Sequence, residues 1–206
     1  REIHHRVKNN LQTISSLLQL QSRRTDSDDA KEAIAESVRR IQSIALVHET
    51  LSREAGEDVA FSEILRPLVQ MVAETVSSPD RHIEFEVRGE AGTLPAQIAT
   101  PMAVVLSELL QNTADHAFPP GAARDEPARV LIDLEEDAEG VVVRVTDNGV
   151  GLDHSHFQNP KSFGLLGMME RAEIIGGQIR FQKREGGSGT VVAVRLPLAP
   201  NKSPET

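Results

Sequence analysis

The spacing of apolar residues changes near residue 59, and this change limits the folds open to the chain. Before residue 59, apolar side chains recur every three or four residues in two long runs, which is typical of helices with one buried stripe. After it, short runs of alternating apolar and polar residues are separated by further helical runs. We therefore predict an all-helical part followed by an α+β part.

The two helical runs, residues 1–24 and 30–51, are separated by the polar segment SRRTDSDD. The first stripe consists of Ile3, Val7, Leu11, Ile14, Leu17 and Leu18. Two helices joined in this way form a hairpin, but they bury such stripes poorly alone. We predict a helical hairpin over residues 1–54 that becomes a four-helix bundle in a homodimer. A monomer whose hairpin packs on the second part is the alternative.

Residues 59–198 are expected to form the second domain, and residues 199–206 a disordered tail. Helices are predicted near 62–77, 101–117 and 165–175, the second with Thr100 as N-cap and Pro101 at the first helical position. Strands are predicted at 82–89, 128–136, 140–147, 177–184 and 189–196. Consecutive strand hairpins with helices grouped between them indicate a two-layer α+β sandwich rather than a doubly wound parallel sheet.

Composition excludes several classes of function. The formal net charge of -9 argues against direct nucleic-acid binding, which needs a basic face. The sequence has no apolar run of about 18 residues, so no membrane contact is expected in this segment. The absence of cysteine excludes a thiol nucleophile and favours a cytoplasmic location. Since the helical pattern is already running at Arg1, we expect a fragment whose sensor region lies upstream.

Three motifs in the second domain suggest a nucleotide site. Glu108 and Asn112 leave one face of a helix, where their oxygens could position a water and coordinate Mg²⁺. DNGVG, at residues 147–151, follows a strand and places a carboxylate beside two glycines that let the backbone approach a flat ligand. FGLLGMM, at residues 163–169, puts two glycines at the mouth of a helix, where free N–H groups favour phosphate.

Each motif alone has an ordinary explanation, as a solvated helix face, a turn or helix punctuation. In this order, and followed by GGSGT at residues 186–190, they resemble the N-box, G1, G2 and final Gly-Thr motifs of the GHKL ATPases. This is the Bergerat nucleotide fold of histidine kinases, gyrase, Hsp90 and MutL proteins. The sequence contains no P-loop motif that would offer another phosphate cradle.

The resemblance implies a set of roles in binding ATP and Mg²⁺. Asn112 would ligate the Mg²⁺ carried by ATP, Glu108 would act catalytically beside the γ-phosphate, and Asp147 would receive the adenine amino group. The segment between Gly151 and Gly164 would be the ATP lid. Gly149 and Gly151 would line the base pocket, and Thr190 would lie behind the adenine. Gly164 and Gly167 would face the phosphates.

One position departs from the family pattern. Many histidine kinases have Lys three residues after the N-box Asn, whereas this chain has Asp115. A phosphate-contacting cation is therefore missing there, and another residue would have to compensate. His116, Lys161 and Arg171 are the candidates.

The first helix carries two adjacent histidines, and geometry favours the second as a phosphoacceptor. At about 100° per residue, the centre of the apolar stripe lies about 170° from His5 and about 70° from His4, so His5 points to water. A neutral imidazole has a free lone pair for attack on phosphorus. The following residue is Arg6, and Glu2 is the nearest carboxylate that could orient the ring. His48 receives no role.

EIHHRVKNNLQ resembles the phosphoacceptor box of histidine kinases with a His-Arg-x-x-Asn signature, the HisKA type 2 class related to the HWE kinases. The resemblance implies a two-component sensor histidine kinase core. ATP would phosphorylate His5, and the group would pass to an Asp of a response regulator receiver domain, with an RNA-binding antitermination output left open. Two alternatives remain: a GHKL serine kinase of the anti-sigma-factor type, and a non-catalytic nucleotide-binding phosphotransfer scaffold.

Overall fold

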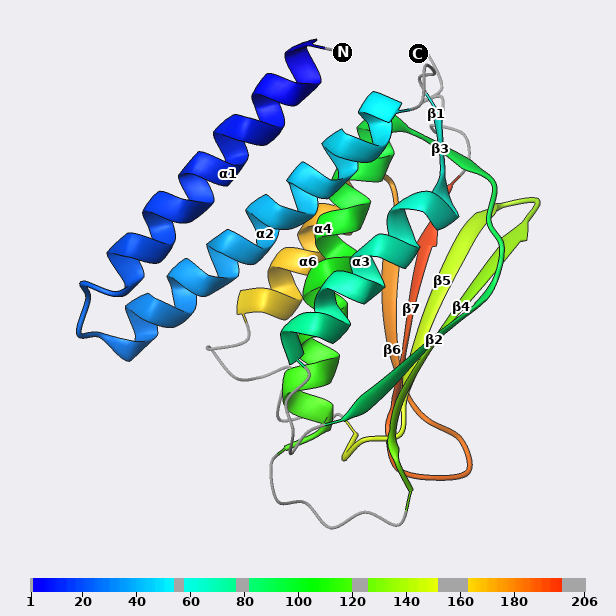
Figure 1. The fold of residues 1–206 in the computed structure, drawn as a ribbon. Helices are drawn as coiled ribbons and strands as arrows, with labels where there is room; N and C mark the ends of the chain where they lie inside the picture. Colours follow the sequence, from blue (N-terminus) through cyan, green and yellow to red (C-terminus); the bar gives the residue numbers. More distant parts are fainter. Residues whose placement is uncertain (1, 54–57, 77–81, 120–125, 152–162, 198–206) are drawn as a thin grey trace, which may run out of the picture. The chain divides into compact units, whose positions relative to one another are not determined.

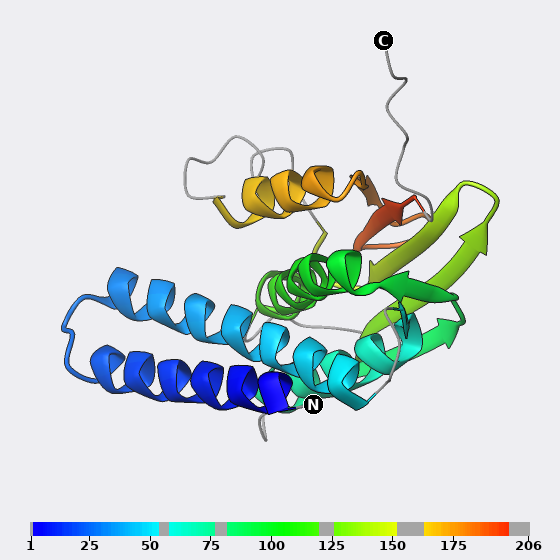
Figure 2. The same cartoon turned by 90° about the horizontal axis from the view of Figure 1, so that it is seen from above.

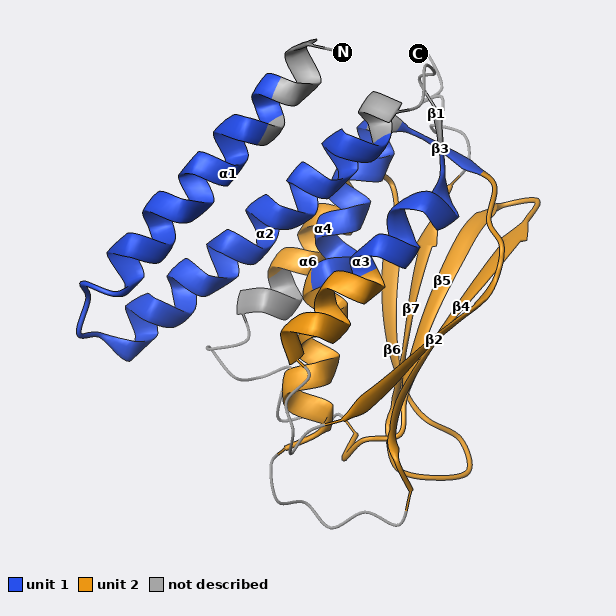
Figure 3. Cartoon of the chain, in the orientation of Figure 1, with its two compact units in different colours: residues 1–68, 93–107 blue, residues 69–92, 108–206 orange. Residues whose placement is uncertain are grey.

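The computed structural model describes residues 2–53, 58–76, 82–119, 126–151 and 163–197 (Figure 1). These residues form two compact units, one of residues 1–68 and 93–107 and the other of residues 69–92 and 108–206 (Figure 3). The domain boundaries 1–54 and 59–198 stay a prediction, and the tail 199–206 lies outside the described residues.

Unit 1 contains the predicted helical hairpin. α1, Glu2–Ser22, and α2, Asp28–Arg53, run side by side (Figures 1 and 2). The Ser27 hydroxyl accepts a hydrogen bond from the Ala30 N–H at 3.3 Å, which caps the start of α2. On α1, large apolar side chains remain 45–56% exposed in the single chain: Ile14, Leu17 and Leu20. The hairpin therefore leaves part of its apolar surface uncovered, and the homodimer stays a prediction.

Unit 1 also holds a small antiparallel sheet that the sequence did not predict. It pairs β1, Asp58–Ala60, with β3, Thr93–Pro95. Each strand has three residues, which is too short to show an alternating pattern.

Unit 2 is built on a five-stranded sheet in the order β2-β4-β5-β7-β6. β2 and β4 pair in parallel, and the other neighbours are antiparallel. The strands are β2 Ile83–Gly89, β4 Ala128–Asp137, β5 Gly140–Asp147, β6 Gln178–Lys183 and β7 Thr190–Leu196. All five predicted strands are confirmed, with ends within about one residue of those expected.

Alternate residues of the strands point to opposite faces of the sheet, and one of these faces is buried and apolar. The buried face is made of Val130, Ile132, Leu134, Val141, Val143, Val145, Val192, Val194 and Leu196. The helical segments of unit 2 lie on one side of this sheet (Figure 3). This arrangement confirms the two-layer α+β sandwich.

The helices agree with the prediction except at one start. α3 spans Phe61–Val76 and α6 spans Phe163–Ile174. α4 spans Ala96–Asn112, so Thr100 lies inside the helix and its assignment as N-cap is wrong. Pro101 likewise lies inside the helix and not at its first position, and because it has no N–H the helix lacks the hydrogen bond to the carbonyl of Gln97. The last predicted turns, Thr113–Ala117, form a π-helix, η1.

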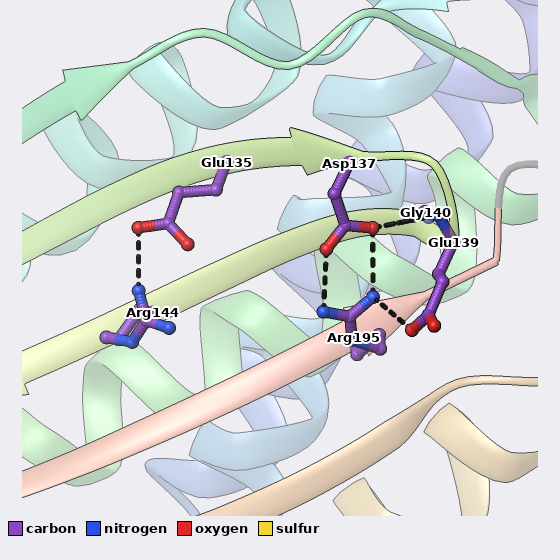
Figure 4. Close-up of polar contacts among 6 residues, drawn as sticks. All are labelled: Glu135, Asp137, Glu139, Gly140, Arg144 and Arg195. Carbon is purple, nitrogen blue, oxygen red and sulfur yellow. Dashed lines mark hydrogen bonds and ion pairs between the residues drawn. The ribbon is translucent and has the colours of Figure 1, made fainter.

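Asp137 ties the β4–β5 turn to β7 (Figure 4). Its carboxylate accepts from the backbone N–H groups of Glu139 and Gly140 at 2.9 and 3.0 Å. It also accepts from both Nη atoms of Arg195, at 3.0 and 2.8 Å. The Arg195 hydrogen bond is the main cause that lowers the pKa of Asp137, and the backbone donor of Glu139 adds to it. The ionised form is therefore favoured in the folded chain.

We expect Asp137→Ala to lower the free energy of unfolding at neutral pH, and to lower it by a smaller amount in acid. A carboxylate whose pKa is lowered by folding contributes stability above its unfolded pKa of about 3.9, and this contribution is lost as the pH falls through the folded value. Urea unfolding at about pH 7 and about pH 2.5 would measure it. Glu185→Ala, at an exposed position, is the control. An equal loss of stability at both pH values would contradict the expectation.

Candidate functional site

Asp147, the last residue of β5, is 4% exposed and forms the centre of the candidate site. Its Oδ1 accepts from the Gly149 N–H at 2.9 Å. Thr190, the first residue of β7 and equally buried, donates to it through both its backbone N–H and its hydroxyl. Two neighbouring strand ends thus hold one carboxylate in a site shielded from water.

Burial raises the pKa of Asp147. The hydrogen bonds from Gly149 and Thr190 and the charge of Arg184 act in the opposite direction, but desolvation outweighs them. A buried carboxylate of this kind is an acceptor, and an N–H donor on a ligand would offset part of its desolvation.

Glycines let the backbone come close on both sides of Asp147. A Cβ atom on Gly149 would lie 2.2 Å from the carbonyl oxygen of Ala117, the last residue of η1. The Val150 N–H donates to that same oxygen at 2.9 Å. A Cβ on Gly189, whose φ is +121°, would lie 2.0 Å from the Asp147 carbonyl oxygen. Any side chain at either position would separate the segments that form the site.

Asn148 fixes the turn that follows β5, and the sequence did not reveal this role. Its Oδ1 accepts from the Arg129 N–H at 2.8 Å, and its Nδ2 donates to the Pro127 carbonyl at 2.9 Å. These bonds hold the turn against the start of β4. Residues 19 and 21 positions earlier supply the partners, so no local pattern could have indicated them.

Glu108 and Asn112 lie one helical turn apart at the end of α4, as predicted. Asn112 is half-buried. The Glu108 carboxylate forms an ion pair with the guanidinium of Arg171, which comes from α6. A Cβ on Gly167 would lie 3.2 Å from Nη2 of Arg171, so the guanidinium also lies against the first turns of α6. The structure thus brings Glu108, Arg171 and Gly167 together.

A family model described as histidine kinase-, DNA gyrase B- and HSP90-like ATPase matches residues 97–200. This segment contains the end of α4, the Asp147 site and α6. The chain belongs to this ATPase family. A second model, described as histidine kinase, matches residues 2–76 and indicates the histidine kinase branch of the family. The resemblance to histidine kinases and GHKL ATPases seen in the sequence is confirmed. The ATPase domain of this chain is of the type that binds ATP.

Known proteins are similar to this chain over nearly all of its length. The sensor histidine kinase PdtaS of Mycobacterium tuberculosis is 41% identical over 96% of this chain, which spans 39% of that protein's length. The histidine kinase domain of the Erythrobacter litoralis EL346 blue-light activated histidine kinase matches with a TM-score of 0.66 and 21% identity, covering 96% of this chain and 89% of that one. The catalytic domain of histidine kinase ThkA matches with a TM-score of 0.56 and 22% identity over 70% of this chain and 97% of its own.

Several expected site residues fall outside the described parts of the chain. His5 belongs to α1, but the side chains of residues 2–5 are not described. Residues 152–162 of the predicted lid, with Lys161, are not described either, and the surroundings of Gly164 in α6 are likewise outside. The role of His5 and the lid therefore stay predictions.

Two further candidate residues follow Asn112 in the chain. Asp115, on η1, is exposed and accepts from Nε2 of Gln111 at 2.8 Å. His116 is exposed as well.

Within the described residues, no group of three or more His, Asp or Glu gathers into a metal site. The same part of the chain has no helix with the length and apolar character needed to cross a bilayer.

We expect the raised pKa of Asp147 to appear as a difference in pH dependence between the wild type and Asp147→Asn. A carboxyl whose pKa is raised by folding contributes stability below its unfolded pKa of about 3.9, and this is lost as the pH rises through the folded value. The wild type should therefore gain stability relative to the variant on going from about pH 7 to about pH 4. Urea unfolding of both proteins along this range is the measurement.

Asp26→Asn, at an exposed position, provides the matched substitution and should show no such change. A constant stability difference between wild type and Asp147→Asn across the range would contradict the assignment.

Proposed function

We propose that the chain is the catalytic core of a two-component sensor histidine kinase. ATP would phosphorylate His5 on α1, and the phosphoryl group would then pass to an Asp of a response regulator receiver domain. The observation that carries the proposal is the presence, in one chain, of a histidine kinase match over residues 2–76 and an ATPase match over residues 97–200. The first supplies an acceptor helix and the second a phosphate donor.

Asp147 would bind the adenine ring through its amino group. This role is supported by the burial of the carboxylate, which disfavours any state in which it lacks a donor. Gly149 and Gly151 would line the base pocket, and Thr190 would back the adenine while it donates to Asp147. The close approach at Gly149 supports a pocket whose walls are backbone.

The phosphate end would be formed by Glu108 and Asn112 of α4 and by Gly164 and Gly167 of α6. Asn112 offers the amide oxygen that a hard cation prefers, and the Asn112 side chain would hold the Mg²⁺ carried by ATP. When bound, Mg²⁺ neutralises charge on the phosphates. The two glycines would face the phosphates, because the first turn of a helix has free N–H groups.

The transfer step needs little beyond positioning. A ring nitrogen of neutral His5 attacks the γ-phosphorus, and an N–P bond forms as the bond from phosphorus to the β–γ bridging oxygen breaks. ADP leaves with that electron pair, and the ring gives up its N–H proton. Glu108, beside the γ-phosphate, would orient the reacting groups or receive this proton.

Assembly and partners are part of the proposal. A homodimer through the α1–α2 hairpin is supported by the exposed apolar side chains of α1. The receiver-domain partner is supported by the sensor histidine kinase relatives. An RNA-binding antitermination output in that partner and a cytoplasmic location complete the proposal.

Incubation with γ-labelled ATP and Mg²⁺ tests the function. The wild type should become labelled, with a label that is lost in acid and survives alkali. His5→Gln and Asn112→Ala should abolish the label, the first without loss of ATP binding, because one removes the acceptor and the other the Mg²⁺ ligand. His4→Gln is the matched control and should still be labelled.

Other outcomes would point elsewhere. Labelling that persists in His5→Gln and disappears in His4→Gln would overturn the choice of acceptor. A label that survives acid would favour the serine kinase. ATP binding without any label would favour the phosphotransfer scaffold.

A further inference from the structure

Arg171 lies between two parts of the proposed phosphate site. Its guanidinium pairs with Glu108, the proposed catalytic carboxylate, and lies 3.2 to 3.3 Å from the position that a Cβ on Gly167 would occupy. The Glu108 side chain is 9% exposed and that of Arg171 is 25% exposed. The pair is therefore largely shielded from water, where charge interactions are stronger than at an open surface.

Arg171 has more donors than this ion pair uses. A guanidinium carries five N–H groups, and the Glu108 contact is made by Nη2. The Nε atom is buried and finds no acceptor among the described residues. A buried N–H without a partner is unfavourable, so a ligand that brings anionic oxygens would satisfy a donor set that is already in place.

The charge balance of the site also calls for a cation. Asp115 takes the position where many histidine kinases have Lys, and it is bonded to Gln111. A triphosphate bound beside Glu108 would place like charges together, which is unfavourable unless a cation lies between them. Arginine suits this position because its planar fork can contact a carboxylate and a phosphate at once.

We propose that Arg171 is a phosphate-contacting residue of the nucleotide site, held in position by Glu108 until the β- and γ-phosphates of a nucleoside triphosphate arrive. This inference rests on the proposed function, because it requires that the site bind ATP. It assigns Glu108 a second role, that of holding Arg171 in the nucleotide-free chain. It also accounts for the lysine that Asp115 replaces.

Calorimetric titration with ATP and with AMP tests the inference without requiring phosphotransfer. Arg171→Gln should weaken ATP binding by about tenfold to a hundredfold, the usual effect of losing a hydrogen bond to a charged group. AMP lacks the β- and γ-phosphates, so its affinity should change by no more than about twofold. Arg180→Gln makes the same chemical change at an exposed position of β6 and should alter neither affinity.

Two further variants separate a phosphate contact from a merely structural ion pair. Glu108→Gln keeps an amide oxygen that can still accept from the guanidinium but removes the charge that competes with phosphate, so it should strengthen ATP binding. Arg171→Lys keeps the charge but not the fork, so its preference for ATP over AMP should be lower than that of the wild type. If Arg171→Gln fails to fold, these two variants still decide the question.

The outcomes are distinguishable. If Glu108→Gln and Arg171→Gln weaken ATP and AMP binding alike, the pair is structural and the inference is overturned. If Arg171→Gln or Arg171→Lys keeps the full wild-type preference for ATP, the inference is also overturned while the proposed function stands. If the wild type binds no ATP, the proposed function itself fails.

Discussion

The hydrogen bond from the Val150 N–H to the Ala117 carbonyl joins the two halves of the candidate site. Ala117 ends the π-helix that continues α4, and the last carbonyls of a helix need a partner from outside it. The segment after β5 supplies that partner. It can approach the Ala117 carbonyl closely because residue 149 is a glycine, and a Cβ atom there would clash with this oxygen. A π-helix has a wider turn than an α-helix and is often found at functional sites. Here it presents a carbonyl oxygen to the segment that carries Asp147.

The two central carboxyl groups of the site have different surroundings. Asp147 is buried and its hydrogen bonds only partly offset desolvation, so its pKa is raised. Glu108 is also shielded, but it has a guanidinium as partner. The first arrangement favours a neutral donor such as an amino group on a flat base. In the second arrangement, the Arg171 guanidinium is bound by Glu108, and an anionic ligand could compete with this carboxylate for it. The two ends of the site are therefore suited to the two ends of a nucleotide.

The sequence predicted the fold well where the pattern is local. β2, β4, β6 and β7 alternate more and less buried residues and β5 is mostly buried, so the positions of the strands could be predicted from their apolar runs. β1 and β3 could not, since three residues carry no period. The start of α4 was misplaced because Thr100 followed by Pro101 is also a common way to begin a helix.

For the site, the sequence identified the side chains but not their partners. Asp147 and Gly149 were singled out because they stand in one short motif, DNGVG, and in the fold the Gly149 N–H donates to the Asp147 carboxylate. The Glu108–Arg171 pair joins residues 63 positions apart, and no periodicity links them. The sequence offered Arg171 as only one of three candidate cations, and its pairing with Glu108 is visible only in the fold. Ion pairs between residues far apart in the sequence depend on how the elements pack. No local pattern in a single sequence shows this packing.

The outer strands of the five-stranded sheet bear on how the protein avoids aggregation. β2 and β6 have a neighbour on one side only in the described sheet. β2 carries Glu84, Glu86 and Arg88 at exposed positions, and β6 carries Arg180 and Lys183. Charges along a free strand discourage a second sheet from adding to it, since pairing would strip them of water. Lateral growth into fibrils is thus disfavoured at both borders, even though the buried face of the three central strands is mostly valine, isoleucine and leucine.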